Sequence, residues 1–431
     1  MRKDAFLIGM LLDMSEKHVQ NTLWTRDFTI ITVGSVISML GNALSGFAMS
    51  LMVLDISKST LLYAIYLMMY TGPQLIMPIL GGALLDRISR KKTIYTLDFI
   101  SAGLYAIMAG VLATGWFSFP IFAAYCFLLG SIESIYQVAY QSFYPLLITD
   151  GNYQKAYSIA SVLETMTAFM VPVSTFLYKL VGLSPLLIAN AVCFFAAAVM
   201  ETQIRHEEEY IETQKENTLK DAGRLRQLTA DMKEGFAYLK VEKGLMAVVV
   251  YFAVMAMCDG VTQVITLPYF KNHYHNGEYV FIIVIGMMVV GRMIGGMIHY
   301  KTVLPAAHRY TIALTVYITI SLFQAVYLFL PIPVMMILCF ADGIGGVTSY
   351  TIRESATQSY VPNEMKGRFN GVFHLLFMIG ALTGQLLAGV LAVWLPERPI
   401  MLVMMSFNAL AALVIIGGAK KYVAPLYNRV Q

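Results

Sequence analysis

The sequence is poor in charged residues and in cysteine. Only 13% of its 431 residues are Asp, Glu, Lys or Arg, whereas a typical soluble domain has about 25%. The four cysteines stand singly inside apolar stretches without a C-x-x-C pair, which excludes a disulfide scaffold, and the His and Cys residues lack the spacing of metal ligands. A net charge of only +4, without one basic patch, argues against nucleic-acid binding.

Apolar residues, by contrast, make up 58% of the chain and form long runs. A helix needs about 20 mostly apolar residues to cross the hydrocarbon core of a membrane, and these runs are too long for the strands of a barrel. The sequence therefore predicts an all-α integral membrane protein with twelve transmembrane helices. The predicted spans are 27–53, 60–82, 93–115, 120–146, 154–178, 184–202, 244–268, 279–298, 310–330, 333–353, 368–392 and 399–419.

Hydrophilic segments and a short repeat divide the chain into two halves. Residues 203–243 separate six spans from six, and their second part has the apolar stripe of an amphipathic helix on a membrane surface, with a simple tether as the alternative. Residues 141–145 (Gln-Ser-Phe-Tyr-Pro) close span four and residues 358–362 (Gln-Ser-Tyr-Val-Pro) follow span ten, which indicates duplication. The predicted organisation is an N-terminal segment 1–26, two pseudo-symmetric six-helix bundles at 27–202 and 244–419 joined by the linker 203–243, and a tail 420–431.

Two loops carry a resemblance to a known family. Residues 82–91 resemble the G-x-L-x-D-R-x-G-R-K motif between spans two and three of the major facilitator superfamily, with Ser89 in place of the second glycine. Residues 362–368 resemble the P-x-E-x-x-G-R segment of its twelve-span drug-efflux subgroup, which includes macrolide exporters. The resemblance covers about residues 25–420 and implies the major facilitator fold.

The resemblance also implies a role for these loops. Asp86 would face the positive N-terminal end of the eleventh span, a contact worth about 0.3–1 kcal/mol when exposed, and would latch one state of the transport cycle. The alternative is a basic anchor that only fixes topology, since basic loops stay in the cytoplasm. The predicted conformational-switch residues are Gly82, Asp86, Arg87, Arg90, Lys91, Gly367 and Arg368.

Polar residues inside the spans are candidate functional residues, because a charged side chain at the bilayer centre costs about 2.5–3.5 kcal/mol. They recur at helical spacing in spans one, four, seven and ten, and the resemblance implies that these spans line a central cavity. A buried carboxyl group there can exchange a proton or hold an organic cation; hydrogen bonding between helices is the alternative. The candidates are Glu133, which is the first choice, Asp259, Asp342, Asn42, Gln137, Gln263 and Tyr140.

Three further charged residues lie within spans. The resemblance places spans five and eight at the contact between halves, so Glu164 and Arg292 are predicted to form a gate that breaks on opening. The alternative is that Arg292 extends to the lipid headgroups. Asp98, near the start of span three, is expected to pair with cations of the nearby loop in a structural role.

These observations predict a secondary transporter rather than an enzyme. We expect it to export amphipathic or aromatic small molecules by alternating access, in antiport with protons that pass through Glu133. An importer or uniporter of another solute and a lysophospholipid or lipid flippase are the alternatives. No P-loop sequence occurs, and no cofactor or metal is expected. The expected setting is the bacterial cytoplasmic membrane with both termini inside, as a monomer whose partners are the substrate, protons and lipid, without nucleic acid.

Overall fold

The structure is a computed structural model that describes residues 22–78, 88–149, 152–206, 208, 222–302 and 304–429. Within these ranges it is built from helices and the turns between them, without a strand. The chain divides into two compact units. The first unit comprises residues 1–51 and 76–219, and the second comprises residues 52–75 and 220–431.

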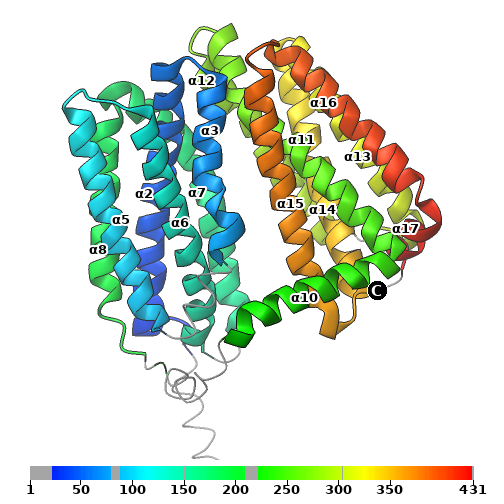
Figure 1. Cartoon of the computed structure of the whole chain (residues 1–431), viewed down its shortest axis with the longest axis horizontal. Helices are drawn as coiled ribbons and strands as arrows, with labels where there is room; N and C mark the ends of the chain where they lie inside the picture. Colours follow the sequence, from blue (N-terminus) through cyan, green and yellow to red (C-terminus); the bar gives the residue numbers. More distant parts are fainter. Residues whose placement is uncertain are drawn as a thin grey trace, which may run out of the picture. The chain divides into compact units, whose positions relative to one another are not determined.

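The first unit contains five long helices and one short turn of helix, shown in blue to green in Figure 1. The helix α5 packs lengthwise against α8 and also contacts α6. Aromatic and aliphatic side chains of α2, α5 and α6 form its core, with Phe28, Ile31 and Phe143 fully buried. The elements are α2 (Arg26–Ser57, of which the part up to Leu51 belongs to this unit), α5 (Arg90–Ala113), α6 (Phe119–Phe143), η1 (Tyr144–Leu147), α7 (Tyr153–Val181) and α8 (Leu183–Glu201).

The second unit contains the end of α2 and the remaining helices. Its main contacts join α11 to α15 and α12 to α14, and α3 lies against α15. This packing on α15 is the reason why α3 groups with the second unit. The elements are α3 (Thr60–Thr71), α10 (Ala222–Val241), α11 (Lys243–His273), α12 (Gly277–Lys301), η3 (Ala306–His308), α13 (Arg309–Val326), η4 (Tyr327–Phe329), α14 (Ile332–Tyr360), α15 (Asn363–Leu391), α16 (Glu397–Ala411), the π-helical turn η5 (Ala412–Gly417) and α17 (Lys420–Tyr427).

Glycine allows the closest helix contacts of the second unit. A methyl group built on Gly384 of α15 would lie 1.8 Å from the carbonyl oxygen of Met257 on α11. Likewise, a methyl group on Gly343 of α14 would lie 2.1 Å from the carbonyl oxygen of Met288 on α12. Small residues at such contacts let two backbones approach, which is how helices associate when lipid removes the usual hydrophobic driving force.

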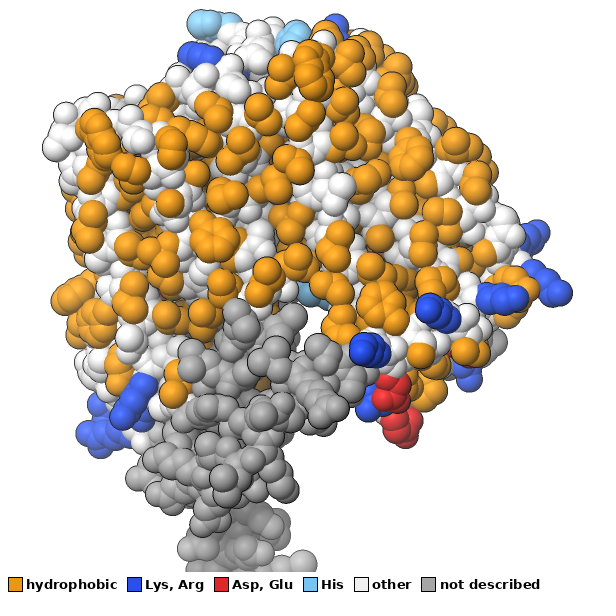
Figure 2. Space-filling view, viewed as in Figure 1, with side chains coloured by type: hydrophobic (Ala, Val, Ile, Leu, Met, Phe, Trp, Pro, Cys, Tyr) orange, Lys and Arg blue, Asp and Glu red, His pale blue; other side chains and the backbone are white. Residues whose placement is uncertain are grey.

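The described helices have the length and surface of membrane spans. Ten of them are long and apolar enough to cross a membrane, α7 coincides with an eleventh predicted span, and α3 covers the first part of the predicted span 60–82. Their outer faces expose aliphatic side chains such as Ile283, Met297 and Val403. On the face shown in Figure 2 hydrophobic side chains cover most of the helices, and Lys and Arg lie toward helix ends. The prediction of an all-α membrane fold is confirmed.

The amphipathic helix of the linker is α10, which crosses one end of α15 in Figure 1. Met232, Phe236 and Leu239 pack against the core of the second unit, and Leu239 is fully buried. The Arg368 guanidinium of α15 donates to Glu234 of α10 at 2.8 Å. The described part of the predicted apolar stripe therefore packs on protein. The expected division into 27–202, 203–243 and 244–419 stays a prediction.

Candidate functional site

In the first unit, Glu133 of α6 lies in a small cavity of about 110 Å³. The Asn42 amide of α2 donates to Glu133 Oε2 at 3.1 Å, and the Gln137 amide donates to Oε1 at 2.9 Å. The Tyr105 hydroxyl donates to Asn42 Oδ1 at 2.9 Å and thereby fixes the amide orientation. The structure thus brings together three residues of the predicted set, from two helices, around one carboxyl group.

Aromatic rings form one wall of this cavity. Tyr136 and Tyr140 of α6 line it, and their rings stack with centroids 6.1 Å apart. Tyr140 in turn stacks on Tyr144 at 5.2 Å. Within the described part of the first unit, the donors to Glu133 are neutral amides and no basic side chain pairs with it. The carboxyl group of Glu133 is therefore held by two amide donors beside a wall of tyrosine rings.

The second unit encloses a larger cavity of about 430 Å³, within the range of ligand sites for small organic molecules. Asp259 of α11 and Asp342 of α14 both line it, whereas Glu133, which was expected beside them, lies in the other cavity. The Gln324 amide of α13 donates to Asp342 Oδ2 at 2.8 Å. Six aromatic side chains contribute to the wall: Tyr251, Phe252, Tyr317, Tyr350, Phe373 and Phe377.

This cavity carries positive as well as negative groups. Arg292 lines it and acts electrostatically on both Asp259 and Asp342. The side chain of Glu164 lies outside the described residues, so the predicted gate between Glu164 and Arg292 stays a prediction. Within the second unit Arg292 shares the cavity with the two aspartates.

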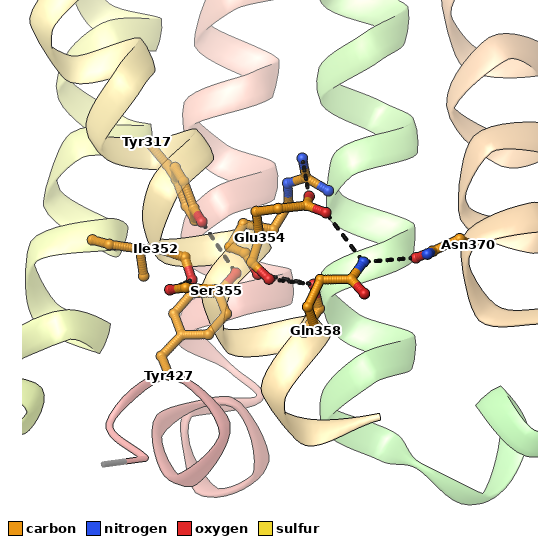
Figure 3. A network of polar contacts seen from close by, with 9 residues as sticks. Tyr317, Ile352, Glu354, Ser355, Gln358, Asn370 and Tyr427 are labelled. Atoms are coloured by element: carbon orange, nitrogen blue, oxygen red, sulfur yellow. Dashed lines mark hydrogen bonds and ion pairs between the residues drawn. The ribbon is translucent and has the colours of Figure 1, made fainter. Parts of the chain in front are cut away.

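Arg353 of α14, which belongs to the polar stripe of span ten but was not among the candidate site residues, also lines this cavity. Its guanidinium carbon lies 4.7 Å from the ring centroid of Phe373 and 4.9 Å from that of Phe252, and its Nη2 pairs with Glu354 at 3.0 Å. The Gln358 amide donates to both Glu354 and Asn370, as Figure 3 shows. Only the position of Arg353 at the end of the polar stripe of span ten could have indicated it.

Gln263 does not line the described cavities. Its Oε1 accepts from the Gln385 amide of α15 at 3.1 Å, and Gln385 accepts from the Thr71 hydroxyl of α3 at 3.2 Å. Gln263 therefore belongs to a polar contact among α3, α11 and α15. This arrangement matches the alternative of hydrogen bonding between helices rather than a substrate site.

Comparisons with known proteins agree with this arrangement of helices. The model of the Major Facilitator Superfamily matches residues 31–384. The chain belongs to the Major Facilitator Superfamily. An uncharacterized MFS-type transporter, YkuC of Bacillus subtilis (strain 168), is 23% identical over 289 residues, which are 64% of this chain and 65% of that protein. The chain thus spans just under two thirds of the length of that relative.

Solved structures of two transporters share the superfamily fold. The crystal structure of the nucleoside transporter NupG has a TM-score of 0.66 at 12% identity and covers 91% of this chain and 99% of that one. A mutant of the peptide transporter POT in complex with alafosfalin has a TM-score of 0.63 at 11% identity, and the match covers 93% of this chain and 95% of that one. At these identities the likeness shows the fold. Because the superfamily is one of transporters, the expectation that the chain is not an enzyme is confirmed.

Two basic residues of the superfamily motif at residues 82–91 anchor the start of α5. The Arg90 guanidinium donates to the carbonyl of Ser142 at 3.0 Å, and Lys91 Nζ donates to the carbonyls of Ile204 and His206, each at 3.2 Å. The Glu208 carboxylate accepts from the backbone N–H of Arg90 at 2.9 Å. A carboxylate at the N-terminus of a helix is stabilising, and the sequence analysis did not identify Glu208 in this role.

The remaining switch residues are only partly described. Gly82, Asp86 and Arg87 lie outside the described residues, so the predicted latch stays a prediction. Gly367 has open space beside it, and Arg368 pairs with Glu234 of α10. The contacts that the structure describes for Arg90, Lys91 and Arg368 are with chain segments of their own unit.

Proposed function

We propose that the protein is a secondary transporter of small amphipathic molecules with an aromatic part, and that it exports them in exchange for protons. The observation that carries this proposal is the 430 Å³ cavity of the second unit, where six aromatic side chains surround Asp259, Asp342 and two arginines. Aromatic walls provide apolar contact for varied ligands, and a few charged groups set orientation. The proposed energy source is the proton gradient, so this transport does not require an ATP-binding motif.

The proton would bind at Glu133 in the first unit. Support comes from its position in the apolar span of α6 and from its two neutral hydrogen-bond donors, Asn42 and Gln137. Alternation of access would then couple protonation of Glu133 to movement of the substrate. We place the protein in the bacterial cytoplasmic membrane with both termini inside, because the basic loops follow the positive-inside rule, and we expect a monomer.

Accumulation of an aromatic cationic dye in inside-out membrane vesicles with an acidified lumen tests this proposal. A proton-driven exporter concentrates the dye in the lumen, and a protonophore releases it. Glu133→Gln should abolish the accumulation, whereas Glu397→Gln, at the start of α16 outside both cavities, should leave it unchanged. Accumulation that persists in Glu133→Gln would refute the role of Glu133, and the absence of accumulation by the unaltered protein would refute export of this substrate class.

A second candidate function is uptake of a zwitterionic solute. The observation that favours it is the mixture of signs in the same cavity, with Arg292 and Arg353 beside Asp259 and Asp342. Paired opposite charges suit a solute that carries both an amino and an acidic group. A peptide transporter shares the fold, so radiolabelled dipeptides are the competing substrates in right-side-out vesicles. Uptake of dipeptides, without dye export, would favour this candidate.

A further inference from the structure

A pair of acidic residues lies in the first unit, outside the set of site residues that was predicted from the sequence. Asp98 of α5 and Glu201 at the end of α8 lie on two closely packed helices and act electrostatically on each other. Both are fully enclosed, with 1% and 0% of their surface exposed. Among the described residues Asp98 adjoins Ser38 and Glu201, and its expected pairing with cations of the nearby loop stays a prediction. Arg90 and Lys91 of that loop donate to backbone carbonyls.

The surroundings of the pair supply almost no hydrogen-bond donors. Among the described residues, the Ser38 hydroxyl donates to Asp98 Oδ2 at 3.3 Å, and neither oxygen of Glu201 meets a donor when both acids are ionised. Glu201 Oε1 lies against the backbone of α2, where a methyl group on Gly34 would come within 3.0 Å of it. A buried carboxylate without donors is costly. One bound proton removes this cost, because it turns the repulsion between the two acids into a hydrogen bond.

Tyr136 adjoins the pair with an unpaired polar group. Its hydroxyl oxygen is buried and lacks a hydrogen-bond partner among the described residues, and both Asp98 and Glu201 act electrostatically on it. A water molecule or an ion beside a buried hydroxyl satisfies its hydrogen bonding. The groups that face the pair are Ser38 from α2, and Glu133, Tyr136 and Tyr140 from α6.

The pair also adjoins the cavity around Glu133. Ser38, which donates to Asp98, lines that cavity together with Tyr136 and Glu133. Glu133 is close enough to Asp98 to repel a charge there. The cavity volume of about 110 Å³ exceeds the roughly 30 Å³ that one water molecule occupies, so water can connect the two sites.

We propose that Asp98 and Glu201 form a proton-binding site that holds one shared proton and exchanges it with Glu133 through the water-accessible cavity lined by Ser38. The transfer is a proton exchange between carboxyl groups, and it needs no further reactant. The exchange with Glu133 rests on the proposed function, but the shared proton does not. The first unit would then carry two protonation sites in series, one at mid-helix of α6 and one where α8 ends.

Infrared spectroscopy of the purified protein in detergent tests the shared proton directly. A protonated carboxyl group has a C=O stretch that is distinct from the carboxylate bands and shifts in deuterium oxide. At neutral pH the unaltered protein and Glu133→Gln should both show a band from the pair. Asp98→Asn and Glu201→Gln should each lose it, because the new amide donates to the remaining carboxylate and replaces the proton. A band that persists in both variants would overturn the proposal.

Transport in proteoliposomes tests the exchange with Glu133. Glu201→Gln should lower proton-driven transport by about tenfold or more, while exchange of labelled for unlabelled substrate without a proton gradient stays within about twofold. An equal loss of both activities would show a structural role and overturn the relay. If Glu201→Gln fails to fold, Ser38→Ala takes its place, and it too should lose proton-driven transport while it keeps the exchange of labelled for unlabelled substrate. Should the unaltered protein transport without protons, the proposed function fails, whereas the infrared result decides the site independently.

Discussion

Replacement of single glycines with alanine should change stability in opposite directions at two kinds of position. At Gly384 a new methyl group would lie 1.8 Å from the Met257 carbonyl oxygen, and backbone atoms cannot move aside as a flexible side chain can. To reach even 3.0 Å, α15 and α11 must separate by about 1.2 Å, and overpacking of this kind costs about 1–3 kcal/mol. Alanine in place of glycine within a helix contributes only about 1 kcal/mol in return, so Gly384→Ala should be destabilising.

The matched control is Gly103→Ala in α5, where the added methyl group would meet no atom within 4 Å. Only the gain in helix propensity applies there, so Gly103→Ala should be neutral or stabilising by up to about 1 kcal/mol. Thermal unfolding of both variants in the same detergent, followed by size-exclusion chromatography with fluorescence detection, compares them. A Gly384→Ala protein at least as stable as Gly103→Ala would refute the close contact between α11 and α15.

Three further predictions concern the cavities and the C-terminal helix. Asn42→Ala removes one of the two donors that hold the Glu133 carboxyl group, so proton-driven accumulation of the dye should be slower than in the unaltered protein, as the vesicle assay would measure. Arg353→Met removes cation–π contacts of about 0.5–2 kcal/mol each and should raise KM for the transported substrate more than it lowers kcat. Burial raises the pKa of Tyr427 above its usual value, so the unfolded chain deprotonates first and the folded state loses stability as the pH rises above about 10. Tyr427→Phe also loses the hydrogen bond to Tyr317 and should be less stable than the unaltered protein at neutral pH. Its stability should then fall less as the pH rises, which thermal unfolding at neutral and alkaline pH would measure.

The fold was predictable because its main determinant is local. Each span is a run of apolar residues, and the bilayer requires helices of a set length. Several helices begin or end at residues such as Gly115, Gly182 and Asn276, where the backbone adopts a positive φ. The assignment of α3 to the second unit was not predictable, since it depends on a packing surface of α15 distant in the sequence.

The candidate site was partly predictable for a related reason. Glu133 and Gln137 are four residues apart on one helix face, so their contact follows from helical spacing, whereas Asn42 approaches them from a different helix. Gln263 has the same spacing from Asp259, yet it turns toward Gln385 because a partner on α15 satisfies its amide. The Asp98–Glu201 pair joins residues about a hundred positions apart, and single-sequence patterns contain no information on such a contact.

Proton movement driven by substrate is the measurement that tests the central claim most directly. Proteoliposomes that contain a pH-sensitive dye, without an imposed gradient, receive an aromatic cationic substrate on one side, and the internal pH is recorded. The account predicts a protonophore-sensitive pH change opposite in direction to substrate flow, present in Glu397→Gln and absent in Glu133→Gln. Substrate flow without a pH change, or the same pH change in Glu133→Gln, would contradict it.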